Sequence, residues 1–208
     1  MLNVCLIISL VASLIYLFGL HRLPEGNLRS LIKTSCVAML AVAAYLAQGP
    51  LMLITGLTLG AVGDFYLSRR WEGAFLAAIS AFALSHIAYI ILFWDSGAMI
   101  TVMAVIAVAI VAAIAMRILM PQAGRLALPI ALYIVTIGAM GAVAFGLPEA
   151  FSFASYAAFL FMASVTVLGL ELFVFKGEGG QITGPFIWVT YYAAQLLFLI
   201  VFAQVALR

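Results

Sequence analysis

Long apolar runs, separated by short polar stretches, dominate the chain. A helix needs about 20 consecutive apolar residues to cross a bilayer. The pattern therefore predicts an α-helical protein that crosses a membrane several times. Seven runs contain no charged residue: 1–20, 34–63, 73–94, 96–116, 126–148, 150–170 and 179–207.

The run 34–63 is too long for one crossing. As a single helix it would extend about 45 Å, against a hydrocarbon core of about 30 Å. It contains the turn signal Gln48-Gly49-Pro50. Division at this turn predicts an all-α, polytopic transmembrane bundle that forms one domain over residues 1–208. Its eight spans are expected near 2–20, 31–47, 51–67, 74–93, 98–117, 126–146, 151–175 and 184–206.

The positions of the basic residues favour this count. With eight spans, eight of the nine Lys and Arg residues lie at or beside the loops of one side: Arg22, Arg29, Lys33, Arg69, Arg70, Arg117, Arg125 and Lys176. Basic residues concentrate on the cytoplasmic side of membrane proteins. We therefore expect both termini to lie outside the cytoplasm. A seven-span arrangement would place the first three of these residues opposite Arg69 and Arg70.

Composition agrees with a membrane protein. Hydrophobic residues make up 68% of the chain and charged residues 8%, whereas soluble domains carry about 25% charged residues. No basic cluster indicates a nucleic-acid site, so nucleic acid is not an expected partner. Cys5 and Cys36 lie in apolar runs, and we interpret them as small buried residues rather than a disulfide or metal site. Arg22 follows the first apolar run, so we interpret 2–20 as a retained span rather than a cleaved signal.

Asp64 is the most informative ionisable residue. It is expected inside the membrane near the cytoplasmic end of the third span, where desolvation of a charge costs at least about 2.5 kcal/mol. One interpretation is a structural carboxylate paired with Arg69, Arg70 or Lys33. The other is a catalytic or ion-handling group.

Glu171 is a second intramembrane carboxylate, near the cytoplasmic end of the seventh span. It lies seven residues after Ser164, so the two share a helix face. Lys176 is near enough in sequence to form an interfacial ion pair with it. The functional and the ion-pair interpretations both stay open.

Other polar residues lie deeper in the predicted spans. His86, beside Ser85 and three residues before Tyr89, either takes part in function or hydrogen-bonds a neighbouring helix. In the last span, Tyr191 and Gln195 share a face because they are four residues apart, and Thr190 and Tyr192 adjoin them. Residues closer to the interfaces are expected to anchor the protein in an aromatic belt: Tyr16, Trp71, Trp94 and Trp188.

A bundle of eight helices can place Lys33, Asp64, Glu171 and Tyr191 around one cavity open to the cytoplasmic side. The sequence has no Gly-x-Ser-x-Gly, His-Glu-x-x-His, Cys-x-x-Cys or phosphate-binding loop. Serine-hydrolase and zinc-protease chemistry therefore lack support. We expect neither a metal site nor a cofactor.

Three segments resemble signatures of the lysoplasmalogenase-like (YhhN-type) membrane family. Residues 60–67, Gly-Ala-Val-Gly-Asp-Phe-Tyr-Leu, are similar to its Gly-Asp signature. Residues 85–89, Ser-His-Ile-Ala-Tyr, are similar to its Ala-His or Ser-His pair followed by Tyr. Residues 190–197, Thr-Tyr-Tyr-Ala-Ala-Gln-Leu-Leu, look like its Thr-Tyr-Tyr-x-Ala-Gln-x-Leu. Lys33 also suits a Lys commonly found at the start of the second helix. The order and spacing of these segments make the resemblance specific.

The chain departs from this pattern in the seventh span. The family usually has Ser-Asp there, and the matching residues are Ser164 and Val165. Glu171 does not replace the missing Asp neatly, because six residues turn a helix by about −120°.

The resemblance implies hydrolysis of the vinyl ether bond of lysoplasmalogens, which gives a fatty aldehyde and a glycerophospho-base. Carboxyl groups suit this reaction, because a proton must be delivered and an oxocarbenium-like state stabilised, as in glycosidases. Asp64 would act as acid or base, and Glu171 or a tyrosine would share the proton work. Lys33 would bind the phosphate. Supporting residues would be Ser85, His86, Tyr89, Ser164, Thr190, Tyr191, Tyr192 and Gln195.

Two other functions are compatible with the sequence. One is a family member without catalytic activity that binds or moves lipid, as Val165 suggests. The other is a small proton-coupled transporter with Asp64 as its coupling site, which would predict discontinuous helices. The expected partners are a lysophospholipid or another amphiphile and membrane lipids. The expected location is the bacterial cytoplasmic membrane.

Overall fold

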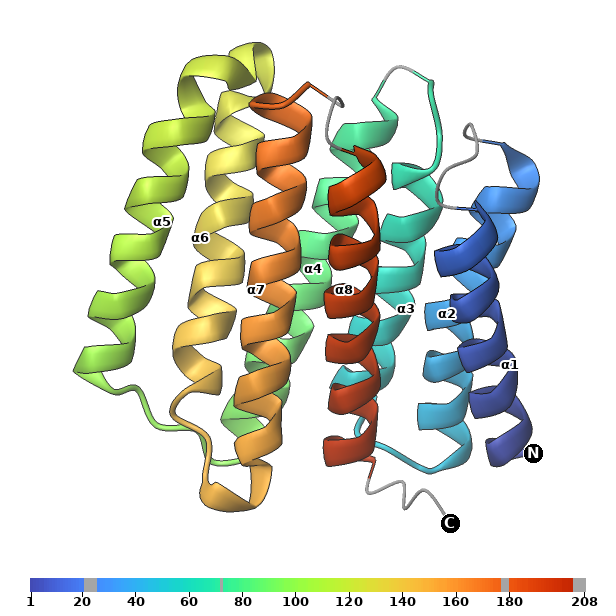
Figure 1. The fold of residues 1–208 in the computed structure, drawn as a ribbon. Coiled ribbons are helices and arrows are strands. Elements are labelled where there is room, and N and C mark those ends of the chain that lie inside the picture. Colours follow the sequence, from blue (N-terminus) through green and yellow to red (C-terminus); the bar gives the residue numbers. More distant parts are fainter. Residues whose placement is uncertain (21–25, 72, 177–179, 204–208) are drawn as a thin grey trace.

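The computed structural model describes residues 1–20, 26–71, 73–176 and 180–203, and this part of the chain is almost entirely helical (Figure 1). Three short helices of other types adjoin the α-helices: η1 (Tyr16–Leu20, π), η2 (Gly124–Leu126, 3-10) and η3 (Glu149–Phe151, 3-10). The all-α prediction is confirmed. The α-helices are α1 (Leu2–Ile15), α2 (Asn27–Leu46), α3 (Leu51–Leu67), α4 (Ala74–Asp95), α5 (Val102–Ala123), α6 (Ala127–Ala144), α7 (Ser152–Phe173) and α8 (Gly180–Phe202).

The turn signal in the long apolar run separates α2 from α3. Gln48 adopts a positive φ of 55°, and the Gly49 amide donates a hydrogen bond to the carbonyl of Ala44, 2.8 Å away. Pro50 then precedes the first residue of α3. Proline suits a helix start because the first amides of a helix have no partner within it.

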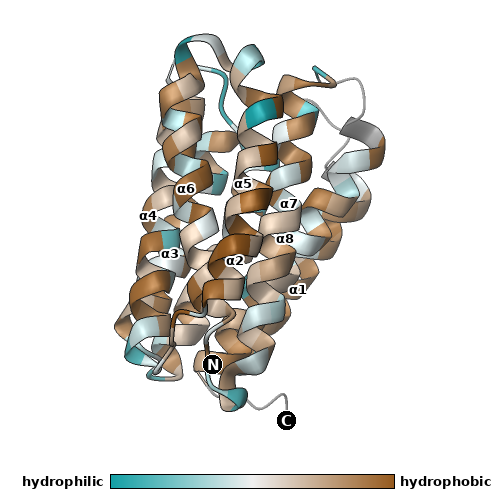
Figure 2. Ribbon diagram, turned by 90° about the vertical axis from the view of Figure 1, so that its left-hand side faces the viewer, coloured by the Kyte–Doolittle hydropathy of each residue, from teal (hydrophilic) through white to brown (hydrophobic). Residues whose placement is uncertain are grey.

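Six segments of the described chain are long and apolar enough to cross a membrane. One of them, 102–144, has 43 residues and includes both α5 and α6, whereas α3 is shorter, with 17 residues. Hydrophobic residues line the middle of the helices, and hydrophilic residues gather toward the ends of the bundle (Figure 2). The chain is therefore an integral membrane protein. Eight crossings, with both termini outside, stay a prediction.

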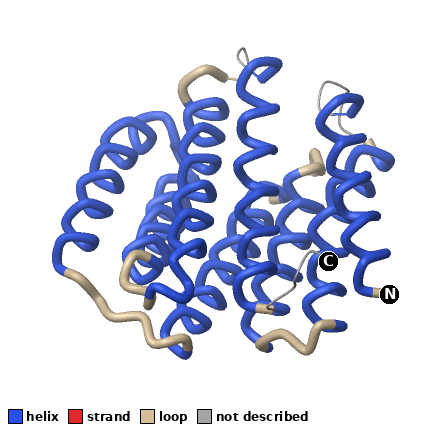
Figure 3. The backbone as a smooth tube through the Cα atoms, turned by 60° about the horizontal axis from the view of Figure 1, so that its bottom comes forward, coloured by secondary structure: helices blue, strands red, loops and turns tan. Residues whose placement is uncertain are grey.

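The end of α1 and the start of α2 lie at one end of the bundle, as do the facing ends of α3 and α4, of α5 and α6, and of α7 and α8 (Figure 1). We call this the connection end. The start of α1 and the end of α8 lie at the opposite end. Helices α1 to α4 pack in sequence order, α4 packs on α6, and α8 lies against α7, α2 and α3. The α5–α6 pair forms the edge of the bundle opposite α1 (Figure 3).

Glycines on one face of α3 bring the neighbouring helices close. A Cβ atom on Gly60 would lie 2.6 Å from Nε2 of Gln195 in α8, and one on Gly63 would lie 2.8 Å from the ring of Phe82 in α4. Cβ atoms essentially never come so close to another atom, so a larger residue at either position would force the Gln195 or Phe82 side chain to move. Small residues commonly permit such contacts between membrane helices. The close packing places α8 beside the Asp64 turn of α3.

Candidate functional site

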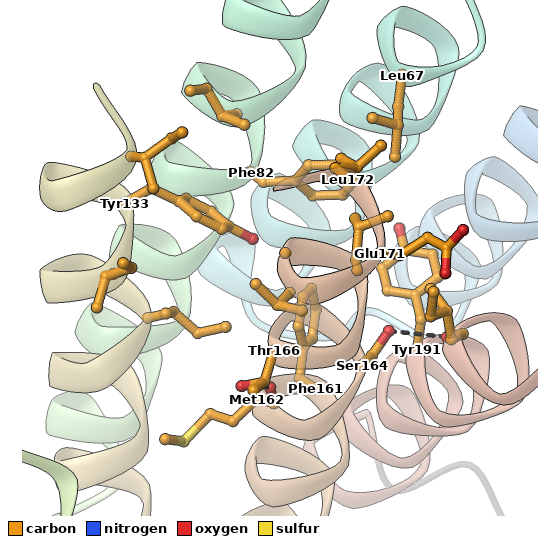
Figure 4. A pocket seen from close by; sticks show the side chains of 18 of the residues that line it. Leu67, Phe82, Tyr133, Phe161, Met162, Ser164, Thr166, Glu171, Leu172 and Tyr191 are labelled. Carbon is orange, nitrogen blue, oxygen red and sulfur yellow. Dashed lines mark hydrogen bonds between the residues drawn. The ribbon is translucent and has the colours of Figure 1, made fainter. Parts of the chain in front are cut away.

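A cavity of about 310 Å³ lies in the half of the bundle nearest the connection end (Figure 4). Two parts of its lining differ in chemistry. We call the part built by Lys33 of α2, Asp64 of α3 and Tyr191 of α8 the polar wall. The apolar wall is built by α5 and α6, with the side chains of Val108, Ala112, Ile134 and Ile137 among others.

The polar wall contains an ion pair and a chain of hydrogen bonds. Lys33 Nζ lies 3.1 Å from Oδ1 of Asp64, and Tyr191 Oη donates to Oδ2 over 2.8 Å. Gln195 Nε2 donates to Tyr191 Oη over 3.4 Å, and Tyr89 Oη donates to Oε1 of Gln195. The chain thus joins α2, α3, α8 and α4 through side chains that are all buried.

Asp64 lies at one end of this series of hydrogen bonds. It is 1% exposed, and Lys33 is 9% exposed. Both groups line the cavity. The structural interpretation of Asp64 predicted a pair with one of three cations, and the structure pairs it with Lys33. A buried ion pair that lines a cavity is compatible with both the structural and the functional interpretation of Asp64.

Glu171 of α7 lines the same cavity and is 6% exposed. Thr183 Oγ1 of α8 donates a hydrogen bond to Oε2 over 2.7 Å. The other oxygen, Oε1, is buried and has no hydrogen-bond partner within the described residues. No ion pair between Glu171 and Lys176, both of which are described, is present. The ion-pair interpretation of Glu171 is therefore wrong: the group faces a cavity instead.

Ser164 and Val165 reach the cavity from α7. Ser164 Oγ donates to the carbonyl of Ile187 in α8 over 2.8 Å, which ties the two helices together. Figure 4 shows Ser164, Glu171 and Tyr191 on one side of the cavity, across from Tyr133 of α6. The resemblance predicts an Asp at position 165, and the cavity lining has Val165 there.

Residues of the Ser-His segment lie behind the cavity rather than in its lining. Ser85 Oγ donates to the carbonyl of Gly56 over 2.7 Å and so links α4 to α3. His86 is fully buried, and its ring packs against Phe161 and Tyr133, with ring centroids 4.7 and 5.4 Å away. Neither ring nitrogen of His86 has a hydrogen-bond partner among the described residues.

Two residues beside Tyr191 point elsewhere. Tyr192 Oη lies 2.8 Å from Ser9 Oγ of α1, and Tyr192 does not line the cavity. Thr190 Oγ1 donates to the carbonyl of Phe186, one turn earlier in its own helix. Of the polar cluster expected in the last span, only Tyr191 lines the cavity.

The predicted belt role is wrong for Tyr16 and Trp188, which are 5% and 3% exposed. Both line the cavity, with ring centroids 4.3 Å apart. Trp188 Nε1 donates to Ser13 Oγ over 3.0 Å, and Lys33 Nζ lies 5.9 Å from its ring. The sequence could have predicted the position of Trp188: it is three residues before Tyr191, so the two share a helix face.

Arg29 also lines the cavity. From the sequence, it indicated only which side of the membrane is cytoplasmic. It lies one turn before Lys33 on α2, and its guanidinium carbon is 5.8 Å from the ring centroid of Tyr16. The spacing of four residues places both cations on one face of the helix. The cavity therefore has two cationic side chains from α2.

A model of the YhhN family matches residues 28–202, which include α2 from its second residue, every helix from α3 to α8 and all the cavity residues from Arg29 onward. No curated protein and no solved structure matches the chain.

Proposed function

The chain belongs to the YhhN family, and from this premise we propose that it is a membrane-embedded hydrolase of the vinyl ether bond of lysoplasmalogens. The products are a fatty aldehyde and a glycerophospho-base. One observation carries the proposal: a single cavity joins an apolar wall to the Lys33–Asp64–Tyr191 group.

The two walls suit the two ends of such a substrate. A lysoplasmalogen has one hydrocarbon chain, a vinyl ether at the head of that chain, and a glycerophosphate beyond it. The chain can lie along α5 and α6, where the lining is apolar. The phosphate can meet Lys33 and Arg29 on α2. The reacting bond, which lies between the two ends, then falls beside Asp64.

Asp64 supplies acid and base in this reaction. Its carboxyl group donates a proton to the alkenyl carbon remote from the ether oxygen, which leaves an oxocarbenium ion. Water adds to the carbon bound to that oxygen and returns a proton to the Asp64 carboxylate. The hemiacetal then breaks its bond to the glycerol oxygen: the hydroxyl group loses its proton as the aldehyde forms, and the glycerol oxygen gains one. One water molecule is consumed, and general acid–base catalysis of this kind contributes about 10²–10⁴-fold.

Lys33 and Tyr191 prepare Asp64 for this role. Tyr191 fixes the orientation of the carboxyl group through its hydrogen bond to Oδ2, and Gln195 and Tyr89 hold Tyr191 in turn. Lys33 has three N–H donors, so it can contact the phosphate. A phosphate that draws Lys33 away from Asp64 removes the charge that favours the carboxylate, and so lets the group carry the proton.

Glu171 was expected to share the proton work, but its contacts favour substrate binding. No hydrogen bond joins Glu171 to Lys33, Asp64 or Tyr191, all of which are described. Glu171 instead accepts a hydrogen bond from Thr183 of α8. We therefore assign the proton transfers to Asp64, with Tyr191 as its positioning residue.

The test is aldehyde release from an alkenyl lysophospholipid by the detergent-purified protein. Asp64→Asn, which removes the acid and keeps the shape, should lower turnover at least about 100-fold. Asp95→Asn is the matched control, because Asp95 is exposed at the opposite end of the bundle. Full activity of Asp64→Asn would refute the role of Asp64.

A second candidate is a family member that binds or moves an amphiphile without cleaving it. The valine at position 165 of the cavity lining favours it. Retained lipid binding by the wild type, with no turnover of any vinyl ether lipid, would support this function. A proton-coupled transporter is less well supported, because α3 runs unbroken through Asp64 from Leu51 to Leu67.

A further inference from the structure

Glu171 is an acidic side chain in the cavity lining that has no cationic partner among the described residues. It is 94% buried (6% exposed), and one of its two carboxylate oxygens, Oε1, has no hydrogen-bond partner in the described chain. A buried carboxylate without a compensating cation is unfavourable, because it has left water and gained little in return. The arrangement therefore calls for a donor that arrives with the ligand.

Asp64, the other carboxylate of the cavity, differs in this respect. Lys33 neutralises it at 3.1 Å, and Tyr191 satisfies its second oxygen. The cations Lys33 and Arg29 both come from α2, whereas Glu171 comes from α7 and is held by Thr183 of α8. The cavity thus has a cationic side and an anionic side on different helices. A ligand with separate negative and positive groups matches this pattern.

The free oxygen of Glu171 also restricts the kind of positive group. An oxygen that lacks a hydrogen bond is satisfied by an N–H donor, and a primary ammonium has three. A quaternary ammonium has none and binds instead against aromatic faces. The unpartnered Oε1 therefore matches a primary ammonium, which can donate a hydrogen bond to it, better than a quaternary one, which cannot.

We propose that Glu171 binds the primary ammonium of an ethanolamine-type lysophospholipid headgroup through Oε1, while Lys33 and Arg29 hold the phosphate. The inference rests on the proposed function and names the headgroup of its substrate. Thr183 acts as a positioning residue, since its hydrogen bond to Oε2 fixes the carboxyl group and leaves Oε1 as the oxygen without a partner in the described chain.

The test compares three alkenyl lysophospholipids that differ only in headgroup: ethanolamine, choline and glycerol. The wild type should favour ethanolamine in kcat/KM. Glu171→Gln keeps the shape and the Thr183 contact but removes the charge. It should lower kcat/KM for ethanolamine about tenfold or more, mainly through KM, and change the glycerol value less than threefold. Glu149→Gln is the matched control, because Glu149 is exposed at the other end of the bundle.

Three results would overturn the proposal. The first is an equal loss on all three headgroups in Glu171→Gln, which would mark Glu171 as part of the proton machinery. The second is no loss on any of them. The third is a wild type that does not favour ethanolamine. Glu171→Asp keeps the charge and should retain part of the preference, so it tests the inference even where Glu171→Gln folds poorly.

A binding measurement separates this inference from the proposed function. The probe is a saturated alkyl ether lysophospholipid, which has no vinyl ether to cleave, with each of the three headgroups. Its binding is followed by Trp188 fluorescence in a Trp71→Phe, Trp94→Phe background, because Trp188 is the cavity tryptophan among the three of the chain. Tighter ethanolamine binding that Glu171→Gln abolishes would uphold the headgroup site even if no vinyl ether lipid is hydrolysed. Equal binding of all headgroups by the wild type would refute it.

Discussion

The polar wall and the apolar wall of the cavity are built in different ways. The polar wall belongs to the large buried core, where α2, α3, α4 and α8 meet and side chains are fixed by hydrogen bonds. The apolar wall is divided: Ile137 of α6 belongs to the same large core, whereas Ile134 belongs to a small separate cluster between α5 and α6. Only three residues of α5 are buried: Val108, Leu119 and Ala123. The polar wall is thus held by many partners, and the α5 part of the apolar wall is an outer layer with few.

This difference indicates a division of tasks. Chemistry requires groups held in a fixed geometry, which buried hydrogen bonds provide. A hydrocarbon chain requires only apolar volume, which van der Waals contacts supply without directional constraints. Substitutions in the polar wall should therefore lower turnover or stability, and those in the apolar wall should change which chains are accepted.

Lys33→Met should have the largest effect. It leaves the Asp64 carboxylate buried without its cation, and loss of one partner of a buried pair typically costs about 3–5 kcal/mol. We expect a marked fall in the thermal unfolding temperature in detergent, together with loss of turnover. The double variant Lys33→Met, Asp64→Asn should regain much of the stability but not the activity. An unchanged unfolding temperature in Lys33→Met would contradict the burial of the pair.

Tyr191→Phe should come next. It removes a hydrogen bond to a charged group, worth about 1.5–3 kcal/mol, which corresponds to roughly 10–100-fold in kcat. Tyr156→Phe is the control, because Tyr156 is exposed on α7. Aldehyde release at saturating substrate would measure both. Equal rates in the two variants would show that Tyr191 does not position Asp64.

Ala112→Phe should have a smaller effect and a different kind. Its ring would fill part of the apolar wall, so long-chain substrates should lose about tenfold in kcat/KM relative to short-chain ones. Ile114→Phe adds the same ring to the same helix at a position that is exposed to lipid. A chain-length series of alkenyl lysophospholipids would compare the two. An identical chain profile in both variants would place the hydrocarbon chain elsewhere.

Single cysteines at Asp95 and Arg125 should have the smallest effect on turnover, less than about twofold, because both side chains are exposed and remote from the cavity. In a background with Cys5→Ala and Cys36→Ala, an impermeant thiol reagent should label them from opposite sides of the membrane. Labelling from one side would refute the eight-span orientation, and with it a cavity on the cytoplasmic side.

Much of the fold was predictable because apolar runs and turn signals are local features. The helical class and the break at Gly49 follow from the chain alone, and the family follows from the order of its motifs. The meeting of Lys33, Asp64 and Tyr191 was a hypothesis only. Which faces of three helices meet depends on packing between them, and here on the absence of a side chain at Gly60.

Errors in the sequence analysis have a common cause. Trp188 and Tyr16 were expected at the lipid interface because of their depth, but depth does not tell which way a side chain points. The expected supporting role of His86 stays a prediction: its ring packs against Phe161 and Tyr133, which line the cavity, and has no polar partner among the described residues. The roles of Glu171 and Thr183 depend on a contact between two helices, which spacing within one helix cannot reveal.

The cavity extends from the connection end of the bundle, beside Arg29 and Ser68, to its middle. With that end on the cytoplasmic side, a lysolipid of the inner leaflet could enter with its headgroup already at the right depth. A lysolipid of the outer leaflet would first have to flip across the bilayer. The protein would then act on the lipid pool of a single leaflet, and its aldehyde product would be released into that same layer.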